Sequence, residues 1–205
     1  MKIVIMVEGK TEKAFKPHLL AFLETRLAGH MPKLDVHKYD HRIPKEGKLR
    51  RTVERLLGEG KQPADAVIAL TDVYTGTQPP DFTDAADAKT KMREWVGANT
   101  KFFPHVAQHD FEAWLLAYWD EIQRLAGSNR NRPTGAAEAV NHSKPPSKRI
   151  GEVFLAGSKG KAYVKARDAN RILRQKNLLD SANECPELKA FLNTILSLCE
   201  GDTIP

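Results

Sequence analysis

The sequence predicts an α/β fold in which a mainly parallel β-sheet is flanked by helices. Two runs of five apolar residues, 3–7 and 66–70, have the length of buried strands, and an acidic residue follows each run. Between and after these runs, apolar residues recur at helical spacing. Strands that alternate with helices are typical of parallel sheets with right-handed crossovers.

The end of the first apolar run carries a candidate functional residue. Glu8 stands where the strand stops, close to the core, and a lone carboxylate is costly there unless it is paired or bound to a metal. Ligands also bind at the carboxyl ends of strands in open α/β sheets. A solvated loop charge is the alternative interpretation. A phosphate-binding loop at Gly9-Lys10 is rejected, because that motif needs an earlier glycine and position 4 is Val.

The rest of the first half follows from spacing and from breaker residues. We expect a helix over 11–28, in which Pro17 either kinks the helix or marks where its regular part begins. Residues 34–39 alternate weakly and predict a second strand. Residues 40–48 predict a polar, basic loop, and apolar residues within 49–57 then keep helical spacing.

The next segments are assigned from apolar runs, Gly and Pro content, and helical spacing. They are a strand at 65–71, a loop at 72–81, a helix at 84–96 and a short strand at 101–108. Pro104 favours an edge position or a bulge for that strand, because proline cannot donate to a ladder. Asp110 is a natural N-cap for the following helix. Glu112 falls off the apolar stripe of this helix and can face the same edge as Glu8 and Asp72.

Composition changes in the last third of the chain. Residues 127–147 are rich in Asn, Gly, Ser and Pro, which predicts a long loop or a boundary. Short basic helices follow, closed by a core-facing helix over 186–199. We therefore expect an α/β core over 1–126 and a basic, mainly helical extension over 127–205 packed on it.

Charge and composition limit the function classes. Residues 144–176, the C-terminal basic segment, hold ten Lys and Arg against two acids, so they carry +8 and the rest of the chain −2. This predicts a polyanionic partner or a solvated basic face. No apolar run approaches the roughly 20 residues of a membrane span, so we expect a cytoplasmic protein without a membrane partner. Cys185 and Cys199 lack the spacing of a disulfide framework or a zinc site.

Three acids follow predicted strands and are expected to meet at one edge of the sheet: Glu8, Asp72 and Glu112. Gathered carboxylates repel one another, and a divalent cation is the usual reason to gather them. Ligand sets made only of oxygen favour Mg²⁺ or Mn²⁺ over zinc. The sequence therefore predicts a site for one of these ions.

Several motifs carry a resemblance to known proteins. Val7-Glu-Gly-Lys-Thr-Glu12, with Asp72 at the end of a later strand, resembles the Toprim fold of topoisomerases, primases and OLD-type nucleases. Together with motifs at 71–76, 108–115, 146–150 and Cys185-Pro, the chain more specifically resembles a Toprim-like bacterial family of unknown function. That family is often encoded beside an AAA or ABC-type ATPase and is linked to phage defence. The resemblance implies a Rossmann-like sheet and covers almost the whole chain.

One position departs from the usual Toprim pattern. That pattern has Asp-x-Asp on the later strand, whereas this chain has Asp72-Val-Tyr74. The change removes one metal ligand and puts two-metal chemistry in doubt, although the narrower family also tends to have Tyr there. Glu112, or Asp110 beside it, is the candidate for the missing carboxylate, since acids commonly occupy both positions in that family.

The resemblance and the charge pattern together imply a Mg²⁺- or Mn²⁺-dependent nuclease or related phosphoryl-transfer enzyme acting on DNA or RNA, in phage defence with an ATPase partner. The alternative is a non-catalytic Toprim-like module that binds a partner ATPase or a nucleotide. The candidate residues are catalytic Glu8, Asp72, His109 and Glu112; metal-binding Glu8, Asp72, Asp110 and Glu112; and substrate-binding Lys10, Lys148, Arg149, Tyr163 and Lys165.

For two sets of candidate residues, an interpretation without a functional role is also open. His109 is either a satisfied histidine at a strand end or a group that contacts phosphate or donates a proton. Lys148 and Arg149 are either solvated charges or phosphate-binding residues. In the second case they act with Tyr163 and Lys165 and bind the nucleic-acid backbone without sequence specificity.

Overall fold

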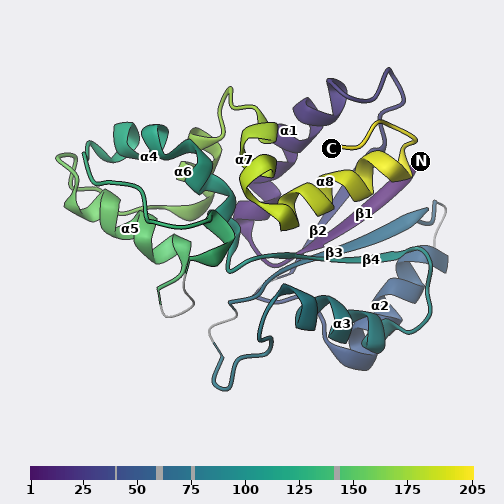
Figure 1. Ribbon diagram of the computed structural model, residues 1–205. Helices are drawn as coiled ribbons and strands as arrows, with labels where there is room; N and C mark the ends of the chain where they lie inside the picture. Colours follow the sequence, from purple (N-terminus) through teal and green to yellow (C-terminus); the bar gives the residue numbers. More distant parts are fainter. Residues whose placement is uncertain (40, 59–61, 75–76, 141–143) are drawn as a thin grey trace.

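The computed structural model describes residues 1–39, 41–58, 62–74, 77–140 and 144–205. Within these ranges, four parallel strands form a sheet in the order β2-β1-β3-β4. They are β1 (Lys2–Val7), β2 (Lys33–Lys38), β3 (Ala66–Asp72) and β4 (Phe102–Ala107). Figure 1 shows helices on both faces of the sheet, so the predicted α/β fold with a mainly parallel sheet is confirmed.

Successive residues of β1 enter different cores, because side chains alternate between the faces of a sheet. Ile5 belongs to the core that includes the first helix and the C-terminal helices, and Met6 belongs to the core on the opposite face. The helices of the first half are α1 (Lys10–Glu24), α2 (Glu46–Gly58) and α3 (Ala85–Val96). Figure 1 shows α2 and α3 together on one face and α1 on the other.

The chain after β4 folds as short helices. They are the 3₁₀ segment η1 (Phe111–Tyr118), α4 (Trp119–Ala126), the 3₁₀ turn η2 (Ala137–Ala139), α5 (Pro146–Ala156), α6 (Lys165–Ile172), α7 (Leu178–Glu184) and α8 (Pro186–Leu198). Ile172 of α6 and Phe191 of α8 are buried in the same core as β1 and α1. Phe15 of α1 also packs edge-on against Phe111, with ring centroids 5.5 Å apart. The division at 126/127 stays a prediction.

Most element positions agree with the predictions. The first helix ends at Glu24 instead of 28 and contains Pro17, and α2 begins at Glu46, inside the predicted loop 40–48. β4 is an edge strand, as Pro104 predicts. Residues 40, 75–76 and 141–143 of the predicted loops lie outside the described part of the chain. No helix in that described part has both the length and the apolar character needed to span a membrane.

Asp110 stands at the predicted N-cap position, at the start of η1. Its carboxylate makes no cap hydrogen bond, and the backbone is a 3₁₀ helix as far as Tyr118. The N–H of Phe111 instead donates to Oδ1 of Asp72, at 3.0 Å. Oδ2 of Asp110 accepts the N–H of Ser147, at 3.2 Å. A carboxylate at the end of β3 therefore satisfies the first free N–H of η1.

Candidate functional site

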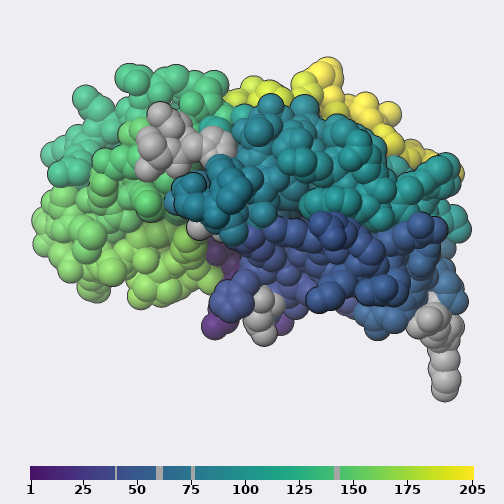
Figure 2. Space-filling model, turned by 90° about the horizontal axis from the view of Figure 1, so that it is seen from below, coloured from purple at the N-terminus to yellow at the C-terminus, as the bar shows by residue number. Residues whose placement is uncertain are grey.

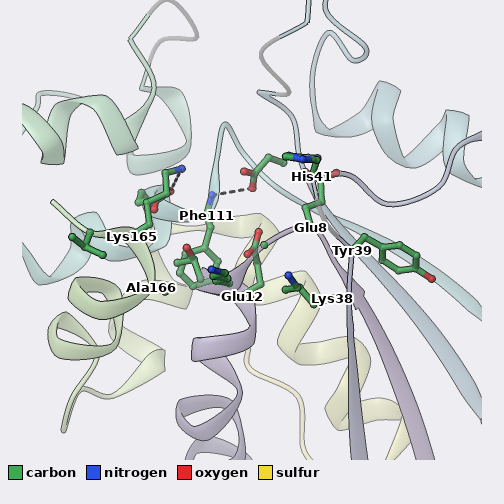
Figure 3. A pocket seen from close by; sticks show the side chains of 14 residues that line it. Glu8, Glu12, Lys38, Tyr39, His41, Phe111, Lys165 and Ala166 are labelled. Carbon is green, nitrogen blue, oxygen red and sulfur yellow. Dashed lines mark hydrogen bonds and ion pairs between the residues drawn. The ribbon is translucent and has the colours of Figure 1, made fainter.

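A pocket of about 740 Å³ opens at the carboxyl edge of the sheet (Figure 3). The strands end there in register, since Val7 pairs with Lys38 of β2 and with Leu70 of β3. Residues that follow these strands therefore meet at one place. Five residues predicted from the sequence line the pocket: Glu8, Lys10, Asp72, Glu112 and Lys165.

Glu8 directly follows β1 and lies beside β3. Its Oε1 accepts a hydrogen bond of 2.5 Å from the hydroxyl of Thr71, and the backbone of Ile43 donates another. Burial raises the pKa of Glu8 to about 7, although the bond from Thr71 acts to lower it. Ionised Glu8 is therefore costly until a positive charge compensates it.

Asp72 is the last residue of β3 and faces the same pocket. Its bond with the N–H of Phe111 fixes the carboxylate at the start of η1. Burial raises the pKa of Asp72 well above its usual range. Four neighbouring carboxylates raise it further: Glu12, Asp110, Glu8 and Glu112. A cluster of negative charge therefore lies around Asp72.

Glu112 reaches the pocket from η1 and is only 1% exposed. Its Oε1 accepts from the Tyr163 hydroxyl at 3.3 Å, and its Oε2 lies 3.3 Å from Nζ of Lys165. Burial and then the charge of Asp110 raise the pKa of Glu112 to about 7, while Lys165 opposes the shift. Burial lowers the pKa of Lys165, but nearby carboxylates, Glu112 first, outweigh it and raise that pKa. Tyr163 itself does not line the pocket.

Glu12 lines the pocket, although it appeared only as the last residue of the first motif and was not among the predicted site residues. Its carboxylate accepts from its own N–H and from that of Gly9, the N-cap of α1. A Cβ on Gly9 would lie 2.8 Å from Oε2 of Glu12, so glycine leaves the room that this carboxylate occupies. Burial raises the pKa of Glu12. The signal was in the first motif, because Glu8 ends a strand and Glu12 stands in the first turn of the next helix.

Lys38, Tyr39 and His41 also line the pocket and were not predicted. They follow or end β2, whose weak alternation gave no sign that its end belongs to a site. In Figure 3 the ring of Tyr39 points away from the carboxylates, toward the outside of the pocket.

Besides Tyr163, four predicted residues do not line the pocket: His109, Asp110, Lys148 and Arg149. His109 is buried. Nζ of Lys148 lies 5.9 Å from the ring centroid of Tyr74, and Nε of Arg149 donates to the carbonyl of Lys144 at 3.1 Å. Nearness in sequence to the acidic motifs therefore does not place the side chains of Lys148 and Arg149 beside the carboxylates.

The donor set of the site fits a divalent cation in its chemistry. Among the described residues, no group of three or more His, Cys, Asp or Glu side chains is arranged to hold a metal ion. Mg²⁺, however, usually keeps several waters and binds through one or two carboxylates, and the donors here are oxygens. Oδ1 of Asp110 adds to this fit, because it is buried without a hydrogen-bond partner among the described residues. Metal binding by Glu8, Asp72, Asp110 and Glu112 stays a prediction.

Solved structures with a similar fold come from OLD proteins. The C-terminal region of the Burkholderia pseudomallei OLD protein matches with a TM-score of 0.55 and 14% identity, over 96% of this chain and 98% of that one. The C-terminal region of the Xanthomonas campestris pv. campestris OLD protein gives a TM-score of 0.48 and 16% identity, over 97% and 96% of the two chains. At such low identity, the first of these matches shows the fold alone.

The search of curated proteins found no match to this chain. A family model described as "Domain of unknown function (DUF4276)" matches residues 7–196, which is most of the sequence. The chain therefore belongs to the DUF4276 family and has the fold of the C-terminal region of OLD proteins.

Proposed function

We propose that this chain is a Mg²⁺- or Mn²⁺-dependent nuclease, or a related phosphoryl-transfer enzyme, acting on nucleic acid. The observation that carries the proposal is the convergence of four carboxylates on one pocket, with a lysine on its wall. They are Glu8, Glu12, Asp72 and Glu112. Such a cluster attracts a divalent cation, and Lys165 provides a charge for a phosphate oxygen.

Each residue has a role that follows from its contacts. Glu8 and Asp72, at the ends of neighbouring strands, would hold the cation, which supplies polarisation of the phosphate and activation of water. Glu12 keeps the loop after β1 in place through its bond to Gly9. Lys165 keeps its bond to Glu112 while about half of its side chain stays exposed, so its ammonium can also bind a phosphate.

A second candidate is a non-catalytic module that binds a nucleotide or a partner ATPase. It is favoured by the hydrogen bonds that Glu12 and Glu112 already make to other residues of this chain, because these bonds leave fewer carboxylates for a metal. Tyr74 in place of a second aspartate favours it too. The partner ATPase and a role in phage defence belong to both hypotheses and rest on the resemblance of the motifs.

The deciding experiment measures cleavage of plasmid DNA and of RNA in the presence of Mg²⁺, Mn²⁺ or EDTA. It is run with and without an ATPase encoded beside the gene for this chain. We expect cleavage that needs the metal and that falls by orders of magnitude in D72N, since Asn keeps the acceptor for Phe111 but loses the charge. The matched control is E138Q, which neutralises another buried carboxyl group whose pKa burial raises to about 7, outside the pocket.

Cleavage by the wild-type chain in EDTA would exclude the metal-dependent mechanism, and full activity of D72N would exclude Asp72 from it. Absence of cleavage under every condition, with nucleotide or ATPase binding intact, would favour the non-catalytic module.

A further inference from the structure

A basic surface lies on α2, far in sequence from the C-terminal basic segment. Lys48, Arg51 and Arg55 line an open cavity of about 320 Å³. Positions three and four apart share one face of a helix, so these three cations form a single row. Figure 2 looks onto the layer that contains α2, whose atoms are blue and form part of the outer surface.

The three cations have no acidic partner among the described residues. The ion pair within α2 joins Arg50 to Glu54, and Lys48, Arg51 and Arg55 are all exposed. In the C-terminal basic segment, by contrast, four cations are in ion pairs with carboxylates: Lys144, Lys165, Arg167 and Arg171. The segment with the larger formal charge is thus partly neutralised, whereas the row on α2 is not.

Tyr39 connects this row to the pocket. It lines the pocket, and its ring points outward from the carboxylates in Figure 3. Tyr39 also packs against the core that contains Leu49 and Val53 of α2, and burial raises its pKa while the charge of Arg55 opposes this rise. The backbone of Ile43, three residues before α2, donates to Glu8, so the start of α2 lies beside the pocket. A chain that leaves the pocket would therefore meet Lys48 first and then Arg51 and Arg55.

We propose that α2 binds the phosphate backbone of nucleic acid where it leaves the pocket, through Arg55, Arg51 and Lys48. From 48 to 55 the helix rises about 10 Å at about 1.5 Å per residue. One strand of a duplex carries a phosphate for about each 3.4 Å of its axis, so the row spans about three phosphates. Such contacts position the backbone without reading sequence. The inference rests on the proposed function, because nucleic acid in the pocket gives the row its ligand.

The test compares two triple variants that each lose three positive charges. The first is K48Q/R51Q/R55Q. The control is K33Q/R93Q/K101Q, which removes exposed cations at the start of β2, in the last turn of α3 and just before β4. In a parallel α/β sheet these positions lie at the edge opposite the pocket. Unchanged circular dichroism and melting temperature would show that both variants fold.

Binding of a fluorescent DNA duplex is measured in EDTA over a series of salt concentrations, so that cleavage plays no part. Each phosphate contact contributes about 0.9 to the log–log salt slope, so the α2 variant should lose about 2 to 3 in slope. The control variant should keep the wild-type slope. Equal slopes in the two variants, or a wild-type chain that binds no duplex, would overturn the inference.

A second measurement separates this inference from the proposed function. With Mg²⁺, the α2 variant should hydrolyse the small phosphodiester bis(p-nitrophenyl) phosphate at the wild-type rate, because that probe fills only the pocket. On plasmid its KM should rise several-fold with little change in kcat. If the wild-type chain cleaves nothing, the proposed function fails while the salt slopes still decide the role of α2.

Poly-glutamate serves as a competitor for the same surface. If poly-glutamate bound as tightly as DNA, and if K48Q/R51Q/R55Q lost both interactions, the inference would be overturned in favour of an acidic protein partner.

Discussion

Glu112 and Glu138 are both buried carboxyl groups whose pKa burial raises to about 7, yet their surroundings differ. Glu138 accepts the N–H of Glu187 at the start of α8, at 3.2 and 3.1 Å. A helix N-terminus carries partial positive charge, so this carboxylate has a local partner. Glu112 instead lies among the charges of Asp110 and Glu12, with Lys165 opposite. Burial alone raises a pKa, whereas gathered like charges also create a place for a cation.

The largest expected effect that tests this comparison is stabilisation by metal. At a Mg²⁺ concentration of about 100 times Kd, binding to the folded chain alone would add about 2.7 kcal/mol. For a chain of this size that corresponds to a rise of about 5–10 °C in Tm. We expect E138Q to show the full rise and D72N to show none, measured by thermal unfolding with MgCl₂ and with EDTA. An equal rise in D72N would remove Asp72 from the metal site.

A smaller effect is expected from E8Q without metal. Gln keeps an acceptor for Thr71 but removes a charge that is repelled by Glu12 and costly to bury. The melting temperature in EDTA at pH 8 should therefore rise by a few degrees, about 1–2 kcal/mol after allowance for solvent screening. The gain should shrink at pH 5, where Glu8 is protonated in the folded chain. A lower melting temperature at pH 8 would mean that ionised Glu8 stabilises the apo chain.

A third test is the pH dependence of stability in EDTA. Glu8, Glu112 and Glu138 have folded-state pKa values of about 7, above the usual 4.5, so the folded chain binds more protons between these values. Their contribution is full below about pH 4.5 and is lost as pH rises through 7, with up to about 1.4 kcal/mol per pH unit for each extra proton.

The titration is repeated with E138Q and with saturating Mg²⁺. The two results show how much of the slope comes from Glu138 and how much from the acids of the pocket. E138Q should flatten the slope only in part, because the pocket acids remain, and saturating Mg²⁺ should flatten the rest. Urea unfolding between pH 5 and pH 8 measures each slope. A slope that disappears entirely in E138Q would place the whole effect at the start of α8.

The sequence could place the acids that end strands, because parallel strands end at one edge whatever the details of packing. Glu8 and Asp72 are of this kind, and both line the pocket. Glu12 was overlooked because an acid in the first turn of a helix has a sufficient local explanation. Asp110 stands at the predicted N-cap position, but the acceptor of the Phe111 N–H, Asp72, comes from a strand 39 residues away and could not be predicted from the local sequence.

The direction of long side chains could not be predicted in the same way. Lys148 and Arg149 stand in a motif near the acids, but the turn of α5 sends one to the ring of Tyr74 and the other to a carbonyl. Lys165 reaches the pocket because α6 begins beside Glu112. Net charge likewise failed to separate paired cations from exposed ones, since pairing depends on which helices become neighbours.

The edge-on contact between Phe15 and Phe111 has a mechanical consequence for the pocket. Phe15 lies three residues after Glu12 on α1, and Phe111 directly precedes Glu112 on η1, so the contact ties together the two supports of these acids. The spacing between the two carboxylates is therefore set by the packing of two buried rings, of which Phe111 also lines the pocket. The distance between the carboxylates of Glu12 and Glu112 is therefore fixed before a ligand binds. The substitution Phe15→Leu would change this distance without altering any charged group.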